Sequence, residues 1–155
     1  MNNQLYNDFN CMDDKRRKEQ EMKLTQEVDY AFRIVSYLMN HPSEVIGAAI
    51  ISEEMHVPLR FLLKILRKLN MADITTSKRG ARGGYLLKDP KRPVTYYEVI
   101  EAIQGPITIN RCLYDDATCV NNYGDKHCPV HYKLHAIQDK ICTALKEEVF
   151  LPAEG

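Results

Sequence analysis

The sequence has no long hydrophobic run and no signal-like start, and both absences bear on where the protein works. Its longest unbroken apolar stretch runs from Val45 to Ile51, whereas about 20 apolar residues are needed to cross a bilayer. The first residues also lack the basic and then apolar order of a secretory signal. We therefore expect a cytoplasmic protein with no membrane partner. Its 155 residues and 45% hydrophobic composition are typical of one ordinary folded domain.

The motifs of the common enzyme classes are missing as well. The chain has no HExxH pair, no glycine-rich phosphate-binding loop, and no nucleophile, base and orienting group at a recognisable spacing. We therefore predict that the protein is not an enzyme. A zinc-dependent or thiol enzyme is the weakest alternative.

An excess of charge of either sign is also absent, but the average hides a strong segregation. The 21 basic and 21 acidic side chains give a net charge of zero. Between Pro58 and Arg92, however, there are ten basic residues and only two acids, so the rest of the chain is acidic. A basic segment on an acidic body is the charge layout of a domain that binds phosphates with one surface.

Apolar spacing and turn residues predict a mainly helical fold with one small β-hairpin. Apolar residues recur every three or four positions in three early segments, which predicts helices over about 24–40, 48–55 and 58–70. Short β-prone runs at 74–76 and 85–87 flank the glycine-rich sequence SKRGARGG, which predicts a hairpin with a basic tip. A capping box at Thr95 opens a fourth helix, and Gly105-Pro106 ends it.

Three helices followed by a hairpin are the elements of a winged helix-turn-helix. In that fold the second helix of the turn enters the DNA major groove, and the hairpin touches the backbone or the minor groove. Lysine and arginine bind phosphates, and arginine also reads guanine edges. The basic residues of the third helix and the hairpin therefore predict a surface for double-stranded DNA. The predicted contacts are Arg60, Lys64, Arg67, Lys68, Lys78, Arg79 and Arg82.

The last predicted helix runs from about Pro129 to Phe150 and has a narrow apolar stripe. The stripe has nearly heptad spacing, which suits pairing with a partner helix, and its members are Leu134, Ile137, Ile141, Ala144 and Leu145. We therefore expect a polar extension over 1–21, a winged helix-turn-helix domain over 22–105, a cysteine-rich sensor loop over 106–128, and a dimerisation helix over 129–151.

Three of the five cysteines lie close together before the last helix. Cys112, Cys119 and Cys128 fall within 17 residues, and His131 follows Cys128 by one helical turn. Thiolates are soft ligands for iron-sulfur clusters and zinc, and imidazole is an acceptable fourth donor. The residues therefore predict a metal or cluster site, with the choice between zinc and iron-sulfur open. Cys142 is expected to pack as a small apolar side chain, and Cys11 to be a bystander.

Three stretches of the chain resemble one family of bacterial regulators. They are MKLTQEVDYAFRIVSYL (22–38), LRKLNMADITTSKRGARGGYLL (66–87) and VTYYEVIEAI (94–103). These stretches are similar to the IscR/NsrR/CymR family of winged-helix transcriptional regulators, also called the Rrf2 type. The hairpin signature RGARGGYLL is the most specific element, and the similarity extends from Met22 to about Phe150.

This resemblance implies a homodimer that binds an imperfect palindromic operator near promoters. It also implies that Cys112, Cys119 and Cys128 together bind one iron-sulfur cluster, either [2Fe-2S] or [4Fe-4S]. The fourth ligand would be His131, or alternatively Asp29 of the partner subunit. The implied function is a repressor that senses iron, redox state or nitric oxide. A cluster-free repressor that senses thiol oxidation or a protein partner, as in the CymR branch, is the alternative.

Overall fold

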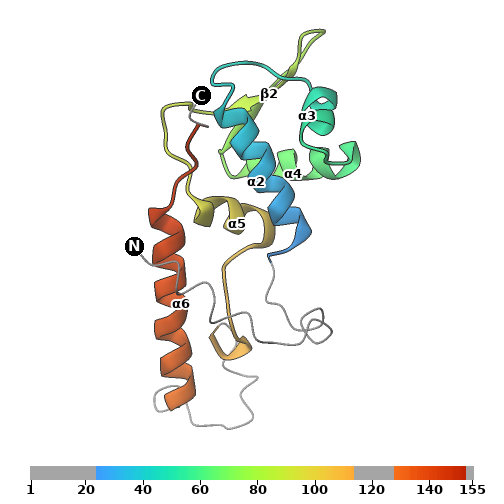
Figure 1. Ribbon diagram of the computed structural model, residues 1–155. Coiled ribbons are helices and arrows are strands. Elements are labelled where there is room, and N and C mark those ends of the chain that lie inside the picture. The colour runs from blue at the N-terminus through green and yellow to red at the C-terminus, as the bar shows by residue number, and fades with distance from the viewer. Residues whose placement is uncertain (1–23, 114–127, 153–155) are drawn as a thin grey trace, which may run out of the picture.

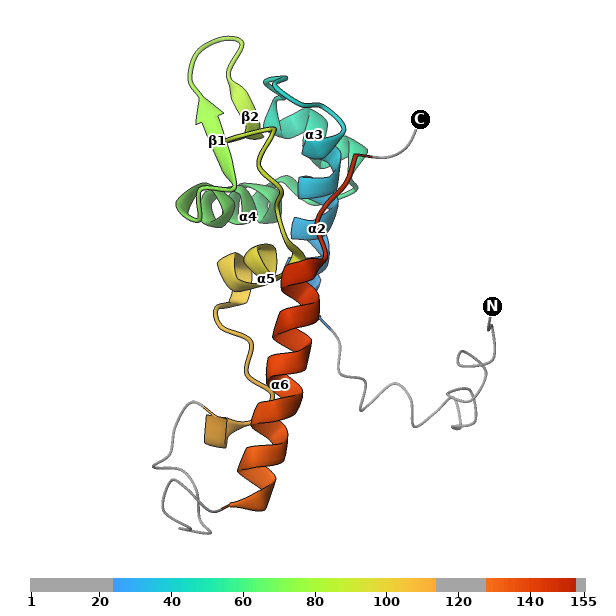
Figure 2. The same cartoon turned by 90° about the vertical axis from the view of Figure 1, so that its left-hand side faces the viewer.

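The computed structural model describes residues 24–113 and 128–152. The predicted extension at 1–21, Cys11, Cys119 and most of the predicted sensor loop lie outside the described residues. Figures 1 and 2 show a head, made of the early helices and the hairpin, from which the long C-terminal helix extends.

Three helices build the head in the predicted order. They are α2 (Gln26–Met39), α3 (Ala48–Glu54) and α4 (Leu59–Met71). Thr25 caps α2, because its hydroxyl oxygen accepts a hydrogen bond from the Val28 amide. Pro58 immediately precedes α4, and its restricted φ of −54° sets the direction in which this helix starts.

The predicted hairpin is present and extends further towards its tip than expected. Strand β1 (Thr75–Lys78) pairs with β2 (Gly84–Leu87) in an antiparallel register. Ile46, between α2 and α3, forms a bridge to Tyr85 through two backbone hydrogen bonds of 3.0 and 2.8 Å. The sequence does not predict this bridge, because a single paired residue has no alternating pattern.

Helix α5 (Tyr96–Gln104) completes the head, where it packs against α2 and α4, and it also packs against the C-terminal helix. Its predicted capping box is confirmed, since the Glu98 amide donates to the Thr95 hydroxyl at 3.1 Å and the Thr95 amide donates to the Glu98 carboxylate at 2.8 Å. Gly105, with a φ of 87°, follows the last residue of the helix as predicted. The short 3-10 helix η1 (Arg111–Leu113) comes next.

Helix α6 (Pro129–Glu147) stops short of its predicted end at Phe150. The next residues instead run beside the start of α5, where the Tyr96 amide donates to the Glu148 carbonyl at 3.1 Å and the Phe150 amide donates to the Val94 carbonyl at 2.8 Å. The Phe150 ring is 5% exposed and stacks on Tyr96. Burial of this ring in the head favours the extended segment over another turn of helix. We call residues 148–150 the C-terminal strap.

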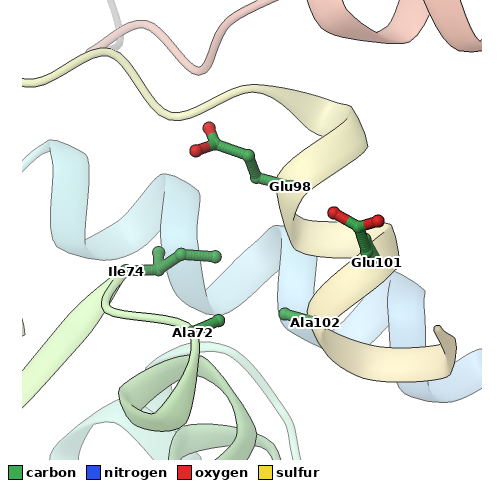
Figure 3. A pocket seen from close by; sticks show the side chains of 5 residues that line it. All are labelled: Ala72, Ile74, Glu98, Glu101 and Ala102. Atoms are coloured by element: carbon green, nitrogen blue, oxygen red, sulfur yellow. The ribbon is translucent and has the colours of Figure 1, made fainter. Parts of the chain in front are cut away.

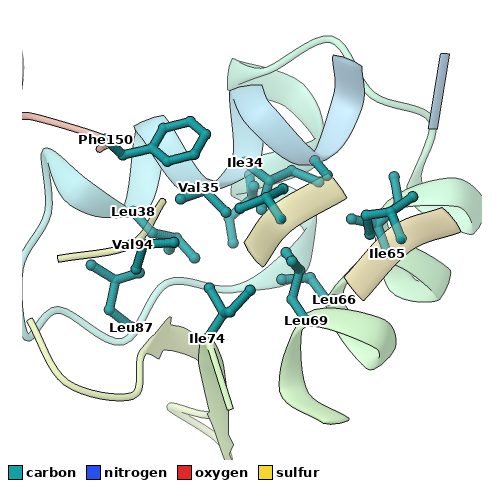
Figure 4. Close-up of a cluster of buried hydrophobic side chains, with 14 of the residues drawn as sticks. Ile34, Val35, Leu38, Ile65, Leu66, Leu69, Ile74, Leu87, Val94 and Phe150 are labelled. Carbon is teal, nitrogen blue, oxygen red and sulfur yellow. The ribbon is translucent and has the colours of Figure 1, made fainter. Parts of the chain in front are cut away.

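One hydrophobic core joins the elements of the head (Figure 4). The residues labelled there come from α2, α4, the hairpin with its flanks, and the strap: Ile34, Val35, Leu38, Ile65, Leu66, Leu69, Ile74, Leu87, Val94 and Phe150. Helix α6, in contrast, has no buried residue. The prediction of a mainly helical fold with one small hairpin is confirmed. None of the described helices combines the length and the apolar character that a membrane span requires.

Candidate nucleic-acid interface and thiol site

Helix α4 carries its apolar and basic side chains on different faces. The inward row is the predicted one, and its four members are completely buried: Leu62, Ile65, Leu66 and Leu69. Arg60, Lys64 and Arg67 are exposed, and their spacing of four and three residues places them on one outward face. The helix contains no acidic residue. Its outward face therefore presents three cations without a carboxylate from the same helix.

Lys68 also belongs to the predicted DNA-contacting set, but its ammonium group is engaged inside the head. It lies 2.9 Å from Glu27 Oε1 of α2 and donates a hydrogen bond of 2.6 Å to the Ile103 carbonyl of α5. Lys64 lies 3.3 Å from the same carboxylate oxygen, but its side chain is 61% exposed, compared with 30% for Lys68. Lys68 therefore ties α4 to two neighbouring helices, whereas Lys64 is accessible from solvent.

The Glu27 carboxylate is held in its ionised form by these two lysines. Burial raises the pKa of Glu27, but Lys68 and Lys64 together outweigh burial and leave the pKa below its ordinary value. The group is therefore negatively charged at neutral pH. This ion pair, in addition to the apolar contacts, fixes the orientation of α4 relative to the first turn of α2.

Glycines shape the basic tip of the hairpin. Gly80 has a φ of 115°, a conformation that other residues rarely adopt. A Cβ atom at Gly83 would lie 2.5 Å from the Lys78 carbonyl oxygen, and one at Gly84 would lie 2.3 Å from the Ile46 carbonyl oxygen. The turn is therefore tight, and it leaves all its predicted cations exposed: Lys78, Arg79 and Arg82. The hairpin projects from the head at the opposite end of the molecule from the start of α6 (Figures 1 and 2).

Two of the three predicted thiol ligands belong to the described residues, and both lie at the end of the molecule away from the hairpin. Cys112 is in η1, and Cys128 is the N-cap residue of α6. Helix η1 packs against α6, and the Ile109 amide donates to the Gln138 side chain at 3.1 Å. Both thiols are free and partly exposed, which fits soft-metal ligation in chemical type. Within residues 24–113 and 128–152, no three His, Cys, Asp or Glu side chains are grouped closely enough to hold a metal ion.

The two candidates for a fourth ligand lie on different parts of the molecule. His131 is partly buried on α6, one turn after Cys128, and its ring centroid lies 6.3 Å from that of His135. Asp29 lies in the first turn of α2, where its carboxylate pairs with Arg33 at 2.7 Å. Within one chain, His131 is therefore the candidate that shares a helix end with a predicted thiol ligand.

Cys142 lies on α6 where this helix packs against α5. Its side chain is partly buried, in keeping with the packing role expected from the sequence. Burial raises the pKa of the neighbouring Tyr97 hydroxyl, and Glu101 and Cys142 raise it further. The Lys146 ammonium group lies 4.5 Å from the centroid of the Tyr97 ring. These contacts connect α6 with the head.

A surface hollow of about 410 Å³ lies between α5 and the end of α4 (Figure 3). Its lining residues are Ala72, Ile74, Glu98, Glu101 and Ala102. The Glu98 carboxylate accepts hydrogen bonds from Arg92 at 2.6 Å and from the Thr95 amide at 2.8 Å, and Glu101 accepts one from Tyr97 at 3.2 Å. These acids therefore serve the local structure, and their charge does not suit phosphate binding.

The sequence interpretation missed two features of α4. It assigned no role to Glu27, because the way in which α2 crosses α4 cannot be read from the sequence. It also did not single out Leu59 and Leu63, which are 45% and 43% exposed beside the basic face. Helical spacing carries a signal for these leucines, since both positions fall outside the row of four buried residues.

Comparison with known proteins places this geometry in a family. The Rrf2 family, described as "Iron-dependent Transcriptional regulator", matches residues 24–150. A protein of Aquifex aeolicus named as an HTH-type transcriptional regulator is 25% identical over 120 residues, which cover 77% of this chain and 83% of that protein.

Two solved structures are similar to the chain. T. potens IscR aligns with a TM-score of 0.64 and 17% identity, and the match covers 83% of each chain. CymR, the global cysteine regulator of B. subtilis, aligns with a TM-score of 0.64 and 20% identity, over 84% of this chain and 94% of that one. These likenesses confirm the predicted winged-helix fold.

Proposed function

Because the chain belongs to the Rrf2 family of transcriptional regulators, we propose that its head binds an operator in double-stranded DNA through α4 and the hairpin. Members of this family regulate transcription and are not enzymes. The observation that carries the proposal is the set of exposed cations that α4 and the hairpin present: Arg60, Lys64, Arg67, Lys78, Arg79 and Arg82.

These cations suit the two tasks of a DNA-binding head. Phosphate contacts release counterions and supply affinity that does not depend on sequence, while arginine can also bind guanine edges in the major groove. The amide groups in the first turn of α4 add a partial positive charge, and no acid in that turn opposes it. Arg79 and Arg82 at the hairpin tip would enter the narrower groove. Lys68 would then act on the helix that reads DNA and not on DNA itself.

The proposed operator is an imperfect palindrome, and the proposed regulator is a homodimer. Helix α6 supports this proposal because none of its residues is buried within the single chain. Its apolar stripe is therefore open to a partner, and Ile137 of the stripe is 49% exposed. Pairing of two α6 stripes would bury apolar area that a single chain leaves in water. The two α4 helices would then reach successive major grooves, about 34 Å apart. The Ile137→Asp variant, which places a charge in the stripe, should be monomeric in analytical ultracentrifugation. The control variant Lys140→Ala, which changes an exposed residue of α6, should stay dimeric.

The proposed signal is iron, redox state or nitric oxide, sensed by an iron-sulfur cluster. Cys112, Cys119 and Cys128 would hold it together with His131, and Asp29 of the partner subunit is the alternative fourth ligand. The free, partly exposed state of Cys112 and Cys128 at one end of α6 supports this assignment. A bound cluster would supply a redox-active and nitric oxide-reactive centre. Zinc would satisfy the same donors without redox chemistry.

The fold offers a route from this site to the DNA-binding surface. Helix α6 has 19 residues, so it spans about 28 Å. Cys128 lies at one end of α6, and the strap that follows the other end is hydrogen-bonded to Val94 and Tyr96. A change in the sensor loop would therefore tilt α6 relative to the head and alter the spacing of two heads in a dimer. DNA affinity would change by the difference in free energy between the two arrangements.

The DNA-binding part of the proposal is tested with the DNA upstream of the protein's own gene. Gel retardation should show a specific complex, and Arg79→Ala should weaken it. Lys140→Ala, which removes an exposed cation on α6, should leave the affinity unchanged. Absence of a specific complex in every metal and redox state would refute the assignment.

The cluster is tested by purification without oxygen. The protein should be brown, with iron, acid-labile sulfide and visible absorbance that Cys119→Ser removes and Cys142→Ser retains. Colourless protein with stoichiometric zinc would favour the structural metal. Metal-free protein that still binds DNA would favour regulation by thiol oxidation or by a protein partner.

A further inference from the structure

Two leucines of α4 point away from the core on a helix whose other leucines are completely buried. Leu59 is 45% exposed and Leu63 is 43% exposed, whereas Leu62, Leu66 and Leu69 have no exposed surface. Single exposed leucines are common on protein surfaces and need no explanation. The placement of this pair relative to the cations of α4 is what makes it informative.

The two leucines form one row that borders the basic face. They are four residues apart, so their side chains lie one above the other on the helix. Leu63 follows Arg60 by three residues and precedes Arg67 by four, which makes both arginines its neighbours on the helix surface. An apolar strip of little more than one turn therefore lies beside the helix positions of two arginines in the first half of α4.

Phe61 shows that an exposed apolar residue on α4 need not belong to this row. Its ring lies 6.5 Å from the Tyr30 ring on α2, and the Arg60 guanidinium carbon lies 5.2 Å from the Phe61 centroid. Phe61 therefore extends the contact between α4 and α2. Leu59 and Leu63 lie on the other side of the outward face, because they are respectively two residues before and two residues after Phe61.

The charge around the strip determines what kind of partner it fits. Helix α4 has four cations and no acid, so a protein surface that covers Leu59 and Leu63 would have to be strongly acidic. Duplex DNA meets both demands at once. Its phosphates match the arginines, and the major groove offers one apolar group, the C5 methyl of thymine.

We propose that Leu63 and Leu59 contact thymine methyl groups, and so make thymine the preferred base beside the positions that Arg60 and Arg67 occupy. This inference rests on the proposed binding of DNA by α4 and adds a base preference to it. Arginine contacts alone would favour guanine or any phosphate, whereas the leucine row discriminates thymine from cytosine and from uracil.

The test uses deoxyuridine, which removes the methyl group and leaves the hydrogen-bonding edge of the base unchanged. The operator is delimited by footprinting on the DNA upstream of the gene, and thymines are then replaced by deoxyuridine in symmetry-related pairs. Burial of one methyl-sized group corresponds to about a four-fold change in affinity, so replacement in both half-sites should weaken binding about 16-fold at the contacted pair. Pairs outside the reach of α4 should show no change.

Variants of α4 assign the effect to the leucines. Leu63→Ala or Leu59→Ala should weaken binding to the thymine operator and abolish the penalty for deoxyuridine at one pair of positions. Leu63→Met, which keeps an apolar side chain, should retain the penalty, as should Met71→Ala, which changes an exposed residue at the last position of the same helix. Unchanged thermal unfolding of each variant shows that the fold is intact.

The outcomes separate this inference from the function on which it rests. Equal affinity of the native protein for thymine and deoxyuridine operators, with specific binding preserved, would overturn the methyl contact and leave DNA binding in place. A full penalty in both leucine variants would also overturn it. Loss of self-association in Leu63→Ala without any effect of deoxyuridine would assign the strip to a protein contact. Failure of every specific complex would refute the proposed function itself.

Discussion

Replacing Phe150 with alanine should lower the free energy of unfolding by about 3–5 kcal/mol, the usual cost of removing a buried phenylalanine ring. The ring is 5% exposed, and its centroid lies 4.2 Å from that of Tyr96 and 5.7 Å from that of Phe32. Each aromatic pair contributes about 0.5–1.5 kcal/mol beyond the burial of its surface. The contacts with Tyr96 and Phe32 therefore support a loss of at least about 3 kcal/mol. The Phe150 amide can still donate to Val94 in the variant, so the loss reports the side chain.

The assay is urea unfolding followed by circular dichroism at one fixed protein concentration, because dimerisation would otherwise shift the midpoint. Leu151→Ala is the matched control, since this neighbouring side chain is 71% exposed and its removal should cost less than about 0.5 kcal/mol. A loss below about 1 kcal/mol in Phe150→Ala would refute the conclusion that the strap is part of the core. It would also remove the proposed link between α6 and the head.

Two further predictions concern the parts that hold α4 and the hairpin in place. Glu27→Gln should lower the free energy of unfolding by about 1 kcal/mol at pH 7. The pKa of Glu27 is lower in the folded protein than in the unfolded chain. This stabilisation is therefore present above the ordinary glutamate pKa of about 4.3, and it disappears as the pH falls through the lower pKa that Glu27 has in the folded protein. Urea midpoints measured from pH 7 to pH 3 should therefore converge for the two proteins, and a constant gap would contradict the ion pair. Gly84→Ala should cost about 1–3 kcal/mol in the same assay, because its Cβ would lie 2.3 Å from the Ile46 carbonyl oxygen. Gly47→Ala has open space around its Cβ and should cost less than about 1 kcal/mol, so equal losses would argue against the close approach.

Most of the head could be predicted from the sequence because its signals are local. The row of buried residues in α4 follows directly from helical spacing, and the capping box at Thr95 lies within four consecutive residues. Gly83 also reflects a local demand, since a Cβ atom there would collide with the carbonyl oxygens of Lys78 and Gly80 in the same turn. In each case the residues that determine the structure are neighbours in the chain.

The features that were missed depend on contacts between distant segments. The apolar pattern of α6 continues to Phe150, and the helix ends at Glu147 because the Phe150 ring packs against the rings of Phe32 and Tyr96. Lys68 looks like any other exposed cation of a basic helix until Glu27 and the Ile103 carbonyl are placed beside it. Net charge along a helix therefore shows where cations gather, but it does not show which of them already have partners within the protein.

Two adjacent residues of α4 provide the most direct test of the proposed DNA-binding surface, because Arg67 is exposed and Lys68 is engaged with Glu27. The measurement is the salt dependence of operator affinity by fluorescence anisotropy for Arg67→Ala and Lys68→Ala. Arg67→Ala should reduce the slope of log affinity against log salt by about one, whereas Lys68→Ala should leave this slope unchanged. An unchanged slope for Arg67→Ala, or an equal reduction for both variants, would contradict the proposed orientation of α4 on DNA.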